Sequence, residues 1–207
     1  MRSGVWARVT RVSSNRIGVL GGTFDPFHLG HLVVASEVCA ALALDRVILV
    51  PAHQQPFKDS TGHAAPEHRL AMCRLAVEGD DRLEVSDVDI ARGGVTYTVD
   101  TLSDIAAMHP DAELFFIAGA DAVSRLSEWR EPARLMQLAT FVGVGRPGHP
   151  APALTPPHLV VETPEVGVSS TEVRRRCRAG EQVRYLVPDA VAAYIAQHAL
   201  YLGGPDA

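Results

Sequence analysis

Five short apolar runs, separated by segments of helical periodicity, constrain the fold of this 207-residue chain more than any other feature. The apolar runs predict strands over residues 17–20, 46–50, 83–88, 114–117 and 141–144. The helical patterns predict helices over residues 29–42, 66–77 and 98–108. Strands that alternate with helices lie in a mostly parallel sheet whose two faces are both covered. We therefore expect an α/β fold, with a doubly wound, mostly parallel sheet of about five or six strands and helices on both faces.

The chain ends and one internal segment fall outside this rhythm. Residues 1–15 lack periodicity and are expected to be a flexible N-terminal extension. Residues 148–157 contain four prolines and predict a surface connection, after which an edge strand over 159–161 and two C-terminal helices follow. A chain of this length buries one sizeable core, so we expect a single domain over residues 16–203.

The charge balance of the chain disfavours a protein that grips nucleic acid. Lysine and arginine number 19 against 24 acidic residues, giving a formal net charge of -5. Nucleic-acid binding needs a basic stripe that displaces counterions from phosphates, whereas small charged ligands need none. The longest apolar runs fall well short of the roughly 20 residues that span a bilayer, so we expect no membrane partner and a cytoplasmic location.

The three cysteines are Cys39, Cys73 and Cys177, which are widely spaced and form no CxxC pair. The spacing matches neither a disulfide framework nor a zinc finger. We expect buried or idle thiols in a reducing cytosol.

The loop after the first predicted strand reads GGTFDPFHLGH, from Gly21 to His31. In doubly wound folds, ligands bind beyond the carboxyl ends of the strands. Gly21 and Gly22 allow the main chain to approach a ligand, and His28 and His31 lie where the N–H groups of a helix start favour an anion. The structural alternative is that the two histidines cap the helix or fill its packing.

The segment VSSTEVR predicts a second helix start. Ser169 and Glu172 fit a capping box, Val168 and Val173 fit a hydrophobic staple, and the pattern predicts a helix over residues 170–179. This structural interpretation is sufficient by itself.

A functional interpretation of the same segment adds phosphate binding. Ser170 and Thr171 bring hydroxyls to an electropositive helix start, and Arg174 carries a planar fork suited to phosphate oxygens. The chain contains neither GxGxxG nor GxxxxGK[ST], which disfavours a nicotinamide-dependent oxidoreductase.

Together these motifs resemble those of the α/β nucleotidyltransferase superfamily, in which HxGH and SSTxxR are the two signature motifs. More closely, GGTFDPFHLGH, GGVTYTVDTL, FFIAGAD, SEW, VGRPG and VSSTEVR are similar in order and spacing to bacterial nicotinate mononucleotide adenylyltransferases. The resemblance runs from Ile17 to about Leu202. It implies a Rossmann-like nucleotidyltransferase fold.

The resemblance also implies which residues hold ATP. It assigns catalytic roles to His28, His31 and Arg174. It assigns ATP binding to Gly21, Gly22, Thr23, Phe24, Gly30, Gly119, Asp121, Arg146, Ser169, Ser170 and Thr171. Within that set, Gly119 and Asp121 meet the ribose and adenine, and Arg146 lines the ATP side.

The second substrate is implied to lie elsewhere. The resemblance places the pyridine nucleotide against the Tyr97–Thr98 backbone and the Trp129 ring. Without the resemblance, Trp129 would be interpreted as a packed core or rim residue and Tyr97 as a strand-end residue. The family commonly has Pro-Pro-His-Lys after the second strand, where this chain has Gln55-Pro56-Phe57-Lys58. Lys58 is expected to serve a phosphate of the substrate.

The implied reaction transfers AMP from ATP to nicotinate mononucleotide and releases pyrophosphate, without a protein nucleophile. Because no clustered carboxylates form a metal cage, Mg²⁺ is expected to arrive with ATP. Asp25 either assists indirectly or caps the turn. The alternatives are nicotinamide mononucleotide or another phosphate acceptor as substrate, and a non-catalytic nucleotide-binding regulator; an oligomer is compatible with the sequence.

Overall fold

The computed structural model describes residues 15–55, 63–145 and 158–203. The predictions for Lys58, Arg146, the extension over residues 1–14 and the connection over 148–157 lie outside these ranges. Within them the chain forms a six-stranded sheet in the order β3-β2-β1-β4-β5-β6, and every neighbouring pair is parallel. The strands are β1 (Asn15–Gly22), β2 (Arg46–Pro51), β3 (Leu83–Val85), β4 (Ala112–Gly119), β5 (Thr140–Gly145) and β6 (Leu159–Glu162). The predicted fold class is confirmed.

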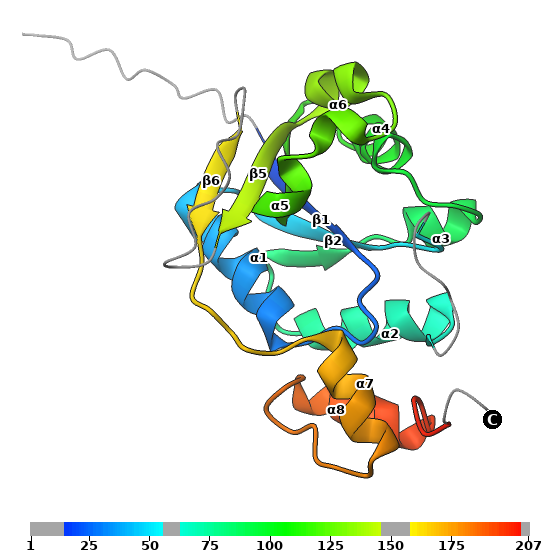
Figure 1. Ribbon diagram of the computed structural model, residues 1–207. Coiled ribbons are helices and arrows are strands. Elements are labelled where there is room, and N and C mark those ends of the chain that lie inside the picture. The colour runs from blue at the N-terminus through cyan, green and yellow to red at the C-terminus, as the bar shows by residue number, and fades with distance from the viewer. Residues whose placement is uncertain (1–14, 56–62, 146–157, 204–207) are drawn as a thin grey trace, which may run out of the picture.

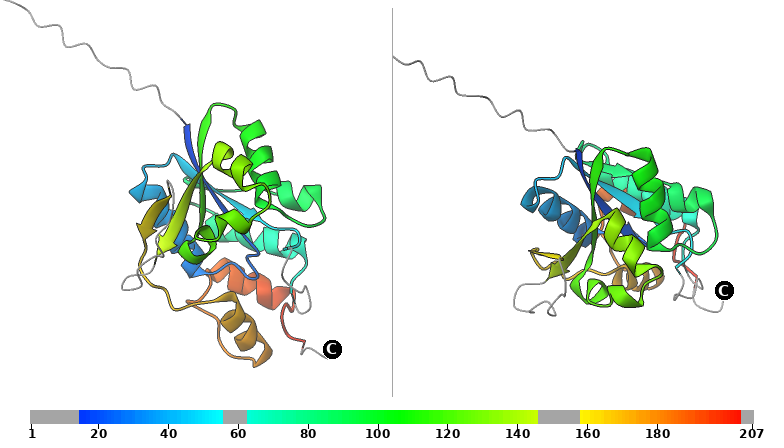
Figure 2. Two further views of the ribbon diagram at one scale, coloured as in Figure 1. Left: turned by 45° about the horizontal axis from the view of Figure 1, so that its top comes forward. Right: turned by 90° about the horizontal axis from the view of Figure 1, so that it is seen from above.

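Helices cover both faces of the sheet (Figure 1). They are α1 (Leu29–Ala41), α2 (Pro66–Val77), α3 (Val88–Arg92), α4 (Thr98–Met108), α5 (Ala120–Val123), the 3-10 helix η1 (Leu126–Glu128), α6 (Pro132–Leu138), α7 (Ser170–Arg178) and α8 (Asp189–Gln197). The view from above in Figure 2 shows the sheet between α1 on one side and α4 on the other. Helices α7 and α8 lie beyond the sheet and pack on α2.

Alternation along the strands produces two apolar cores, one on each face. In β1, Ile17 and Val19 are buried against α4, α5 and α6, and Leu20 is buried against α1. Gly18 also belongs to the α1 face, where an added Cβ would lie 2.9 Å from Leu44. The close approach of β1 to the α1–β2 connection therefore requires glycine at this position.

A third core joins the C-terminal helices to the domain. Met72 of α2 packs with Val173 and Cys177 of α7 and with Val191 and Ile195 of α8. The C-terminal part of the chain is thus anchored to the same helix that covers the sheet.

The order of the strands places the ligand-binding edge. The chain runs outward from β1 through β2 to β3, and then returns to build β4, β5 and β6 on the other side of β1. In such sheets the crevice between the two strands where the order reverses, here β1 and β4, opens at their carboxyl ends. Gly22 and Gly119 end these two strands.

The strand predicted over residues 83–88 is wrong at its C-terminal half. β3 ends at Val85, and Val88 begins the short helix α3. The next residue, Asp89, fixes this helix, because it is 2% exposed and accepts hydrogen bonds from Thr101 (2.8 Å) and Arg92 (2.7 Å). β1 begins at Asn15, one residue before the predicted start of the domain.

All three cysteines are free and buried, as expected. No helix in the described part of the chain combines the length and apolar character needed to cross a membrane.

Candidate active site

The loop between β1 and α1 turns tightly inward after Gly22. A Cβ at Gly22 would lie 2.8 Å from the ring of Phe24, which has a left-handed backbone (φ 51°). Phe24 and Phe27 are both buried, and their rings lie 5.3 Å apart. Gly22 is therefore required by packing within the loop itself.

His28 and His31 form a stacked pair at the start of α1, and their ring centroids lie 3.7 Å apart. His28 is the N-cap, and its N–H donates to Nδ1 of His31 at 3.2 Å. Burial lowers the pKa of His28 to about 4. Burial, followed by the neighbouring His28, holds the pKa of His31 well below its usual range. Both rings are thus neutral at pH 7 in the absence of ligand.

The hydrogen bond from His28 fixes the tautomer of His31. A nitrogen that accepts an N–H cannot carry the proton of a neutral imidazole, so the proton of His31 is on Nε2. Nε2 of His31 has no hydrogen-bond partner among the residues that the structure describes. The capping interpretation therefore holds for Nδ1, and Nε2–H remains as a donor for a ligand.

The first N–H of α1 is already satisfied. Leu29 donates to the carbonyl of Leu186, in the connection between α7 and α8, at 3.0 Å. In this conformation the Leu29 N–H is not offered to an anion, contrary to the expectation from the helix start alone.

Helix α7 begins as predicted, although the capping box is half made. Ser169 is the N-cap, and its hydroxyl accepts the N–H of Glu172 at 3.2 Å. The carboxylate of Glu172 does not return to Ser169 because Arg175 and Arg176 each bind it at 2.8 Å. These hydrogen bonds lower the pKa of Glu172 to about 2.

The start of α7 docks on the β1–α1 loop, so the two sequence motifs meet. Ser170 donates its hydroxyl proton to the carbonyl of Pro26 at 3.0 Å. Arg174 donates to the carbonyl of Asp25 at 2.6 Å and to the hydroxyl of Thr171 at 3.4 Å. The structure thereby brings together residues that are almost 150 positions apart in the sequence.

Asp25 is the centre of this junction and is only 1% exposed. Its Oδ1 accepts the N–H of Ala64 at 3.0 Å and the hydroxyl of Tyr201 at 2.6 Å. Its Oδ2 lies 2.7 Å from Nδ1 of His63 and 3.6 Å from Arg174. Burial, and then the charge of Asp25, raises the pKa of Tyr201.

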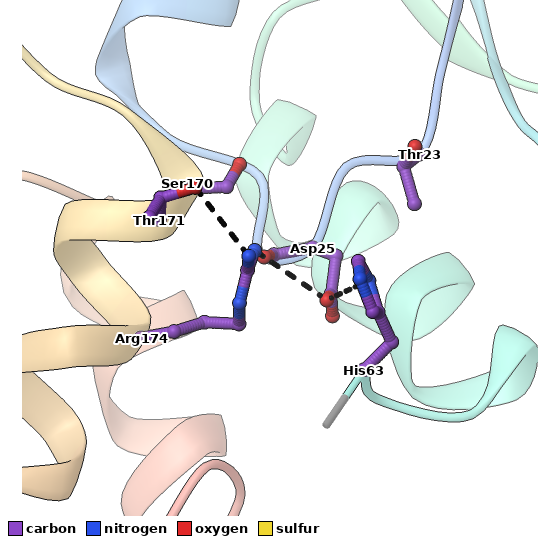
Figure 3. A pocket seen from close by; sticks show the side chains of 6 residues that line it. All are labelled: Thr23, Asp25, His63, Ser170, Thr171 and Arg174. Carbon is purple, nitrogen blue, oxygen red and sulfur yellow. Dashed lines mark hydrogen bonds and ion pairs between the residues drawn. The ribbon is translucent and has the colours of Figure 1, made fainter. Parts of the chain in front are cut away.

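A cavity of about 330 Å³ opens beside Asp25 (Figure 3). Its lining residues come from the β1–α1 loop, the start of α2 and the first turns of α7: Thr23, Asp25, His63, Ser170, Thr171 and Arg174. The cavity falls in the size range of small-molecule sites and is lined by polar groups. Four of the predicted ATP-site residues line it, whereas His28 and His31 do not. Sequence reasoning missed His63, because no local pattern links it to Asp25.

A buried arginine, also missed, holds the loops around the cavity. Arg69 of α2 is 3% exposed and donates to four main-chain carbonyls, those of Thr23 (2.7 Å), Ala52 (2.6 Å), His53 (2.8 Å) and Ala64 (3.1 Å). Burial lowers the pKa of Arg69 below its ordinary value. The guanidinium ties the ends of β1 and β2 to the segment before α2.

At the end of β4, Gly119 is the exposed N-cap of α5, and a Cβ there would meet no described atom within 4 Å. Asp121 is exposed in the first turn of α5, and its carbonyl accepts the hydroxyl of Ser124 at 2.8 Å. Both residues are accessible at the carboxyl edge where the prediction placed the nucleoside.

The predicted pyridine segment lies at the start of α4, with Tyr97 as N-cap and Thr98 as first residue. The neighbouring Thr96 is fixed to the end of β2, because its N–H donates to Gln54 at 2.8 Å and its hydroxyl accepts from His53 at 3.0 Å. The guanidinium of Arg130 lies 4.6 Å from the centre of the Tyr97 ring.

Trp129 follows η1 and packs into the rim of the core on the α4 face. Its ring is edge-on to Phe116 (5.9 Å) and Phe141 (6.0 Å). Part of the Trp129 ring is therefore packed in the core, as the structural interpretation expects. Tyr97 packs against the same core, separate from the cavity beside Asp25.

Within residues 15–55, 63–145 and 158–203, no group of three histidine, cysteine, aspartate or glutamate side chains could hold a metal ion. Oδ1 of Asp25, the carboxylate of the cavity, accepts two hydrogen bonds, whereas Oδ2 lies within ion-pair distance of His63 and Arg174 and accepts no hydrogen bond from a described residue.

The sequence and the fold both match known proteins. The family described as cytidylyltransferase-like matches residues 19–176. A protein of Corynebacterium kroppenstedtii, named probable nicotinate-nucleotide adenylyltransferase, is 48% identical over 93% of this chain and 94% of its own length. A Thermus thermophilus protein of the same name is 48% identical over 90% of this chain and 99% of its own length. The structure of Plasmodium falciparum nicotinic acid mononucleotide adenylyltransferase complexed with NaAD superposes with a TM-score of 0.75, covering 90% of this chain and 97% of that chain, at 19% identity.

Proposed function

The chain belongs to the cytidylyltransferase-like family, and we propose that it is a nicotinate-nucleotide adenylyltransferase. It transfers AMP from ATP to nicotinate mononucleotide, giving nicotinate adenine dinucleotide and pyrophosphate, in NAD biosynthesis. The observation that carries this proposal is the meeting of the β1–α1 loop, which leads directly into HLGH, with the SSTEVR segment at the junction beside Asp25. Curated relatives that bear this name match nearly the whole chain.

The reaction is an in-line displacement at phosphorus. An oxygen of the mononucleotide 5'-phosphate attacks the α-phosphorus of ATP, and the bond from that phosphorus to the bridging oxygen of pyrophosphate breaks. A phosphate monoester is already a competent nucleophile, so the protein has to position two polyanions and stabilise their charge.

The residues around the cavity supply donors for this task. Arg174 offers a guanidinium and Thr171 a hydroxyl at the start of α7, where the helix dipole favours an anion. The Ser170 hydroxyl, which donates to Pro26 in this conformation, becomes a donor to a ligand only by giving up that bond. His31 offers Nε2–H as a neutral donor, and His28 lies stacked on it. A bound polyanion favours the charged form of each imidazole, so binding raises their pKa values toward neutrality. Lys58 and Arg146 are proposed as further phosphate-binding cations on sequence grounds.

We assign Mg²⁺ to the ATP phosphates rather than to a protein cage. Magnesium usually keeps several waters and binds through substrate phosphates, so it requires no dedicated cage of protein carboxylates. When bound, the metal neutralises charge on the phosphates.

The pyridine nucleotide is proposed to bind at the start of α4. The first N–H groups of a helix have no intrahelical partner, so those of Thr98 and Val99 are donors suited to the nicotinate carboxylate. Trp129 is proposed to stack on the ring with the part of its surface not packed on the core. The buried thiols fit a reducing compartment, which supports a cytoplasmic location.

The proposal is tested by measuring pyrophosphate release with ATP and each mononucleotide, and identifying the dinucleotide by mass spectrometry. A carboxylate accepts from two main-chain donors, whereas an amide leaves one donor mispaired, at about 1 to 3 kcal/mol. We expect kcat/KM to favour nicotinate mononucleotide about ten- to hundredfold. Equal or reversed values would overturn the preference for the acid substrate, and no turnover with any acceptor would indicate a nucleotide-binding regulator.

A further inference from the structure

Tyr201, near the C-terminal end of the chain, reaches the loop that follows the first strand. Its hydroxyl donates to Oδ1 of Asp25 at 2.6 Å, across 176 positions of sequence. The ring packs with α7 and α8 in the third core, and its backbone is left-handed (φ 65°). A non-glycine residue holds such a conformation only where its surroundings fix it, so Tyr201 is firmly placed.

Within the described residues, the carboxylate of Asp25 has contacts from four sides. At 1% exposure it is enclosed by the N–H of Ala64, the hydroxyl of Tyr201 and the ring of His63, with Arg174 at 3.6 Å. Ala64 and Tyr201 are the two donors to Oδ1. Removal of the tyrosine hydroxyl therefore leaves Oδ1 with one donor and fixes the carboxylate less firmly.

Asp25 in turn contacts Arg174 through two of its groups. Its main-chain carbonyl accepts from Nη1 of Arg174 at 2.6 Å, and its carboxylate lies 3.6 Å from the same nitrogen. Figure 3 shows the guanidinium between Asp25 and the start of α7. The direction in which Arg174 presents its remaining N–H groups to the cavity depends on where Asp25 is held.

We propose that Tyr201 is a positioning residue for adenylyl transfer, because its hydroxyl holds Asp25 and Asp25 orients Arg174 toward the phosphates of ATP. This role rests on the proposed function. Tyr201 does not line the cavity, so it acts through Arg174 and does not touch the substrate. The C-terminal segment thus completes a site whose other residues come from the β1–α1 loop, the start of α2 and α7.

The first test compares Tyr201→Phe with Tyr194→Phe. Tyr194 lies in the same helical core, and its hydroxyl bonds to Nδ1 of His68 at 2.9 Å, away from the cavity. Tyr201→Phe is expected to weaken binding of the α,β-methylene analogue of ATP, and to lower kcat/KM for ATP, each about tenfold. The KM for nicotinate mononucleotide stays unchanged. Tyr194→Phe is expected to leave all three values at the wild-type level. The two variants are expected to change the melting temperature by similar amounts.

The second test asks whether the effect passes through Arg174. In an Arg174→Ala background, Tyr201→Phe is expected to change analogue affinity by less than about twofold, because the group that Tyr201 positions is gone. Equal effects in both backgrounds, or a Tyr201→Phe variant that behaves like Tyr194→Phe, would overturn the proposal. If Tyr201→Phe does not fold, Asp25→Asn takes its place in the same cycle with the same expectation. Analogue affinity is measured without turnover. If the variants show this coupling but the wild-type protein makes no dinucleotide, the proposed function is contradicted and the role of Tyr201 in positioning Arg174 is not.

Discussion

The imidazole of His31 combines a structural and a chemical task because its two nitrogens face different partners. Nδ1 accepts the N–H of His28 and so completes the helix start, which leaves the proton on Nε2. The ring is packed edge-on to Phe24, at 5.0 Å, where an imidazolium would be poorly solvated. A neutral donor tolerates this environment and gains charge only when a polyanion arrives.

Two substitutions of His31 separate these tasks. Glutamine at the third helical position can return its side-chain oxygen to the N-cap N–H, as in a capping box. We expect His31→Gln to keep the free energy of unfolding within about 1 kcal/mol of wild type while turnover falls by about 10². His31→Ala should lose both, since the packing with Phe24 is also removed. Urea unfolding and steady-state kinetics measure the two quantities, and a His31→Gln enzyme with wild-type turnover would make the ring a cap only.

Trp129 poses a similar question on the other face of the sheet. If its free surface stacks on the pyridine ring, Trp129→Ala should raise the KM for the mononucleotide about tenfold more than the KM for ATP, the scale of an aromatic stacking contact. Trp129→Phe, which keeps an aromatic ring at this position, should lose less. Lower thermal stability with both KM values unchanged would leave only the edge-on packing with Phe116 and Phe141.

At the scale of elements, the strongest sequence signals gave accurate boundaries. The predicted helices over residues 66–77 and 98–108 coincide with α2 and α4, because each has a clear start, Pro66 at the first turn and a Gly-Gly loop before Thr98. The strand predicted over 83–88 was wrong at its C-terminal half because Val88 begins α3, whose Asp89 is buried by Thr101 of α4 and by Arg92 of the same helix.

The short elements after β4 were not predicted at all. α5 and η1 are four and three residues long, too short to show periodicity. Both motifs of the candidate site were predicted from the sequence, whereas the junction between them at Asp25 was not. His63 and Tyr201 approach Asp25 only through the tertiary fold, so no spacing along the chain points to them.

The start of α7 allows the cap and the phosphate site to be tested separately. Ser169→Ala removes the hydroxyl that accepts the Glu172 N–H and should cost about 1 kcal/mol of stability, with a smaller effect on turnover because the helix N–H groups remain. Glu172→Gln is the matched control: its carboxylate binds exposed arginines instead of the N-cap, so it should cost less than about 0.5 kcal/mol. The free energies come from urea unfolding. A larger loss for Glu172→Gln than for Ser169→Ala would mean that the ion pairs of Glu172, rather than the Ser169 cap, hold the start of α7.

At the scale of the whole molecule, the site is a junction of parts that are each held by a different core. The β1–α1 loop belongs to the sheet, the start of α7 belongs to the third core, and both meet at Asp25. Arg69 links the ends of β1 and β2 through hydrogen bonds to the carbonyls of Thr23 and Ala52. Because buried polar groups link these parts, protonation of a buried group here should change the free energy of unfolding of the whole protein.

The stability of the protein should therefore fall as the pH is lowered from 7 to 5. Burial lowers the pKa of His28 to about 4 in the folded protein, from 6.5 in the unfolded chain. Between these values the unfolded state binds more protons than the folded state, so stability is complete above pH 6.5 and is lost as the pH falls toward 4. Integrated to pH 5, His28 alone accounts for about 2 kcal/mol. His31, whose pKa is lowered in the same direction, adds to this loss.

His28→Asn isolates this contribution, because asparagine is a favourable N-cap and does not titrate in this range. Urea unfolding of both proteins at pH 7 and pH 5 gives the difference in free energy. We expect the wild type to lose about 2 kcal/mol more than the variant over this interval. ATP at saturating concentration should reduce the difference, since a polyanion beside the imidazole favours its protonated form in the folded state. Equal losses in the two proteins without ligand would mean that His28 titrates as it does in the unfolded chain, and that burial at the start of α1 does not hold the pair neutral.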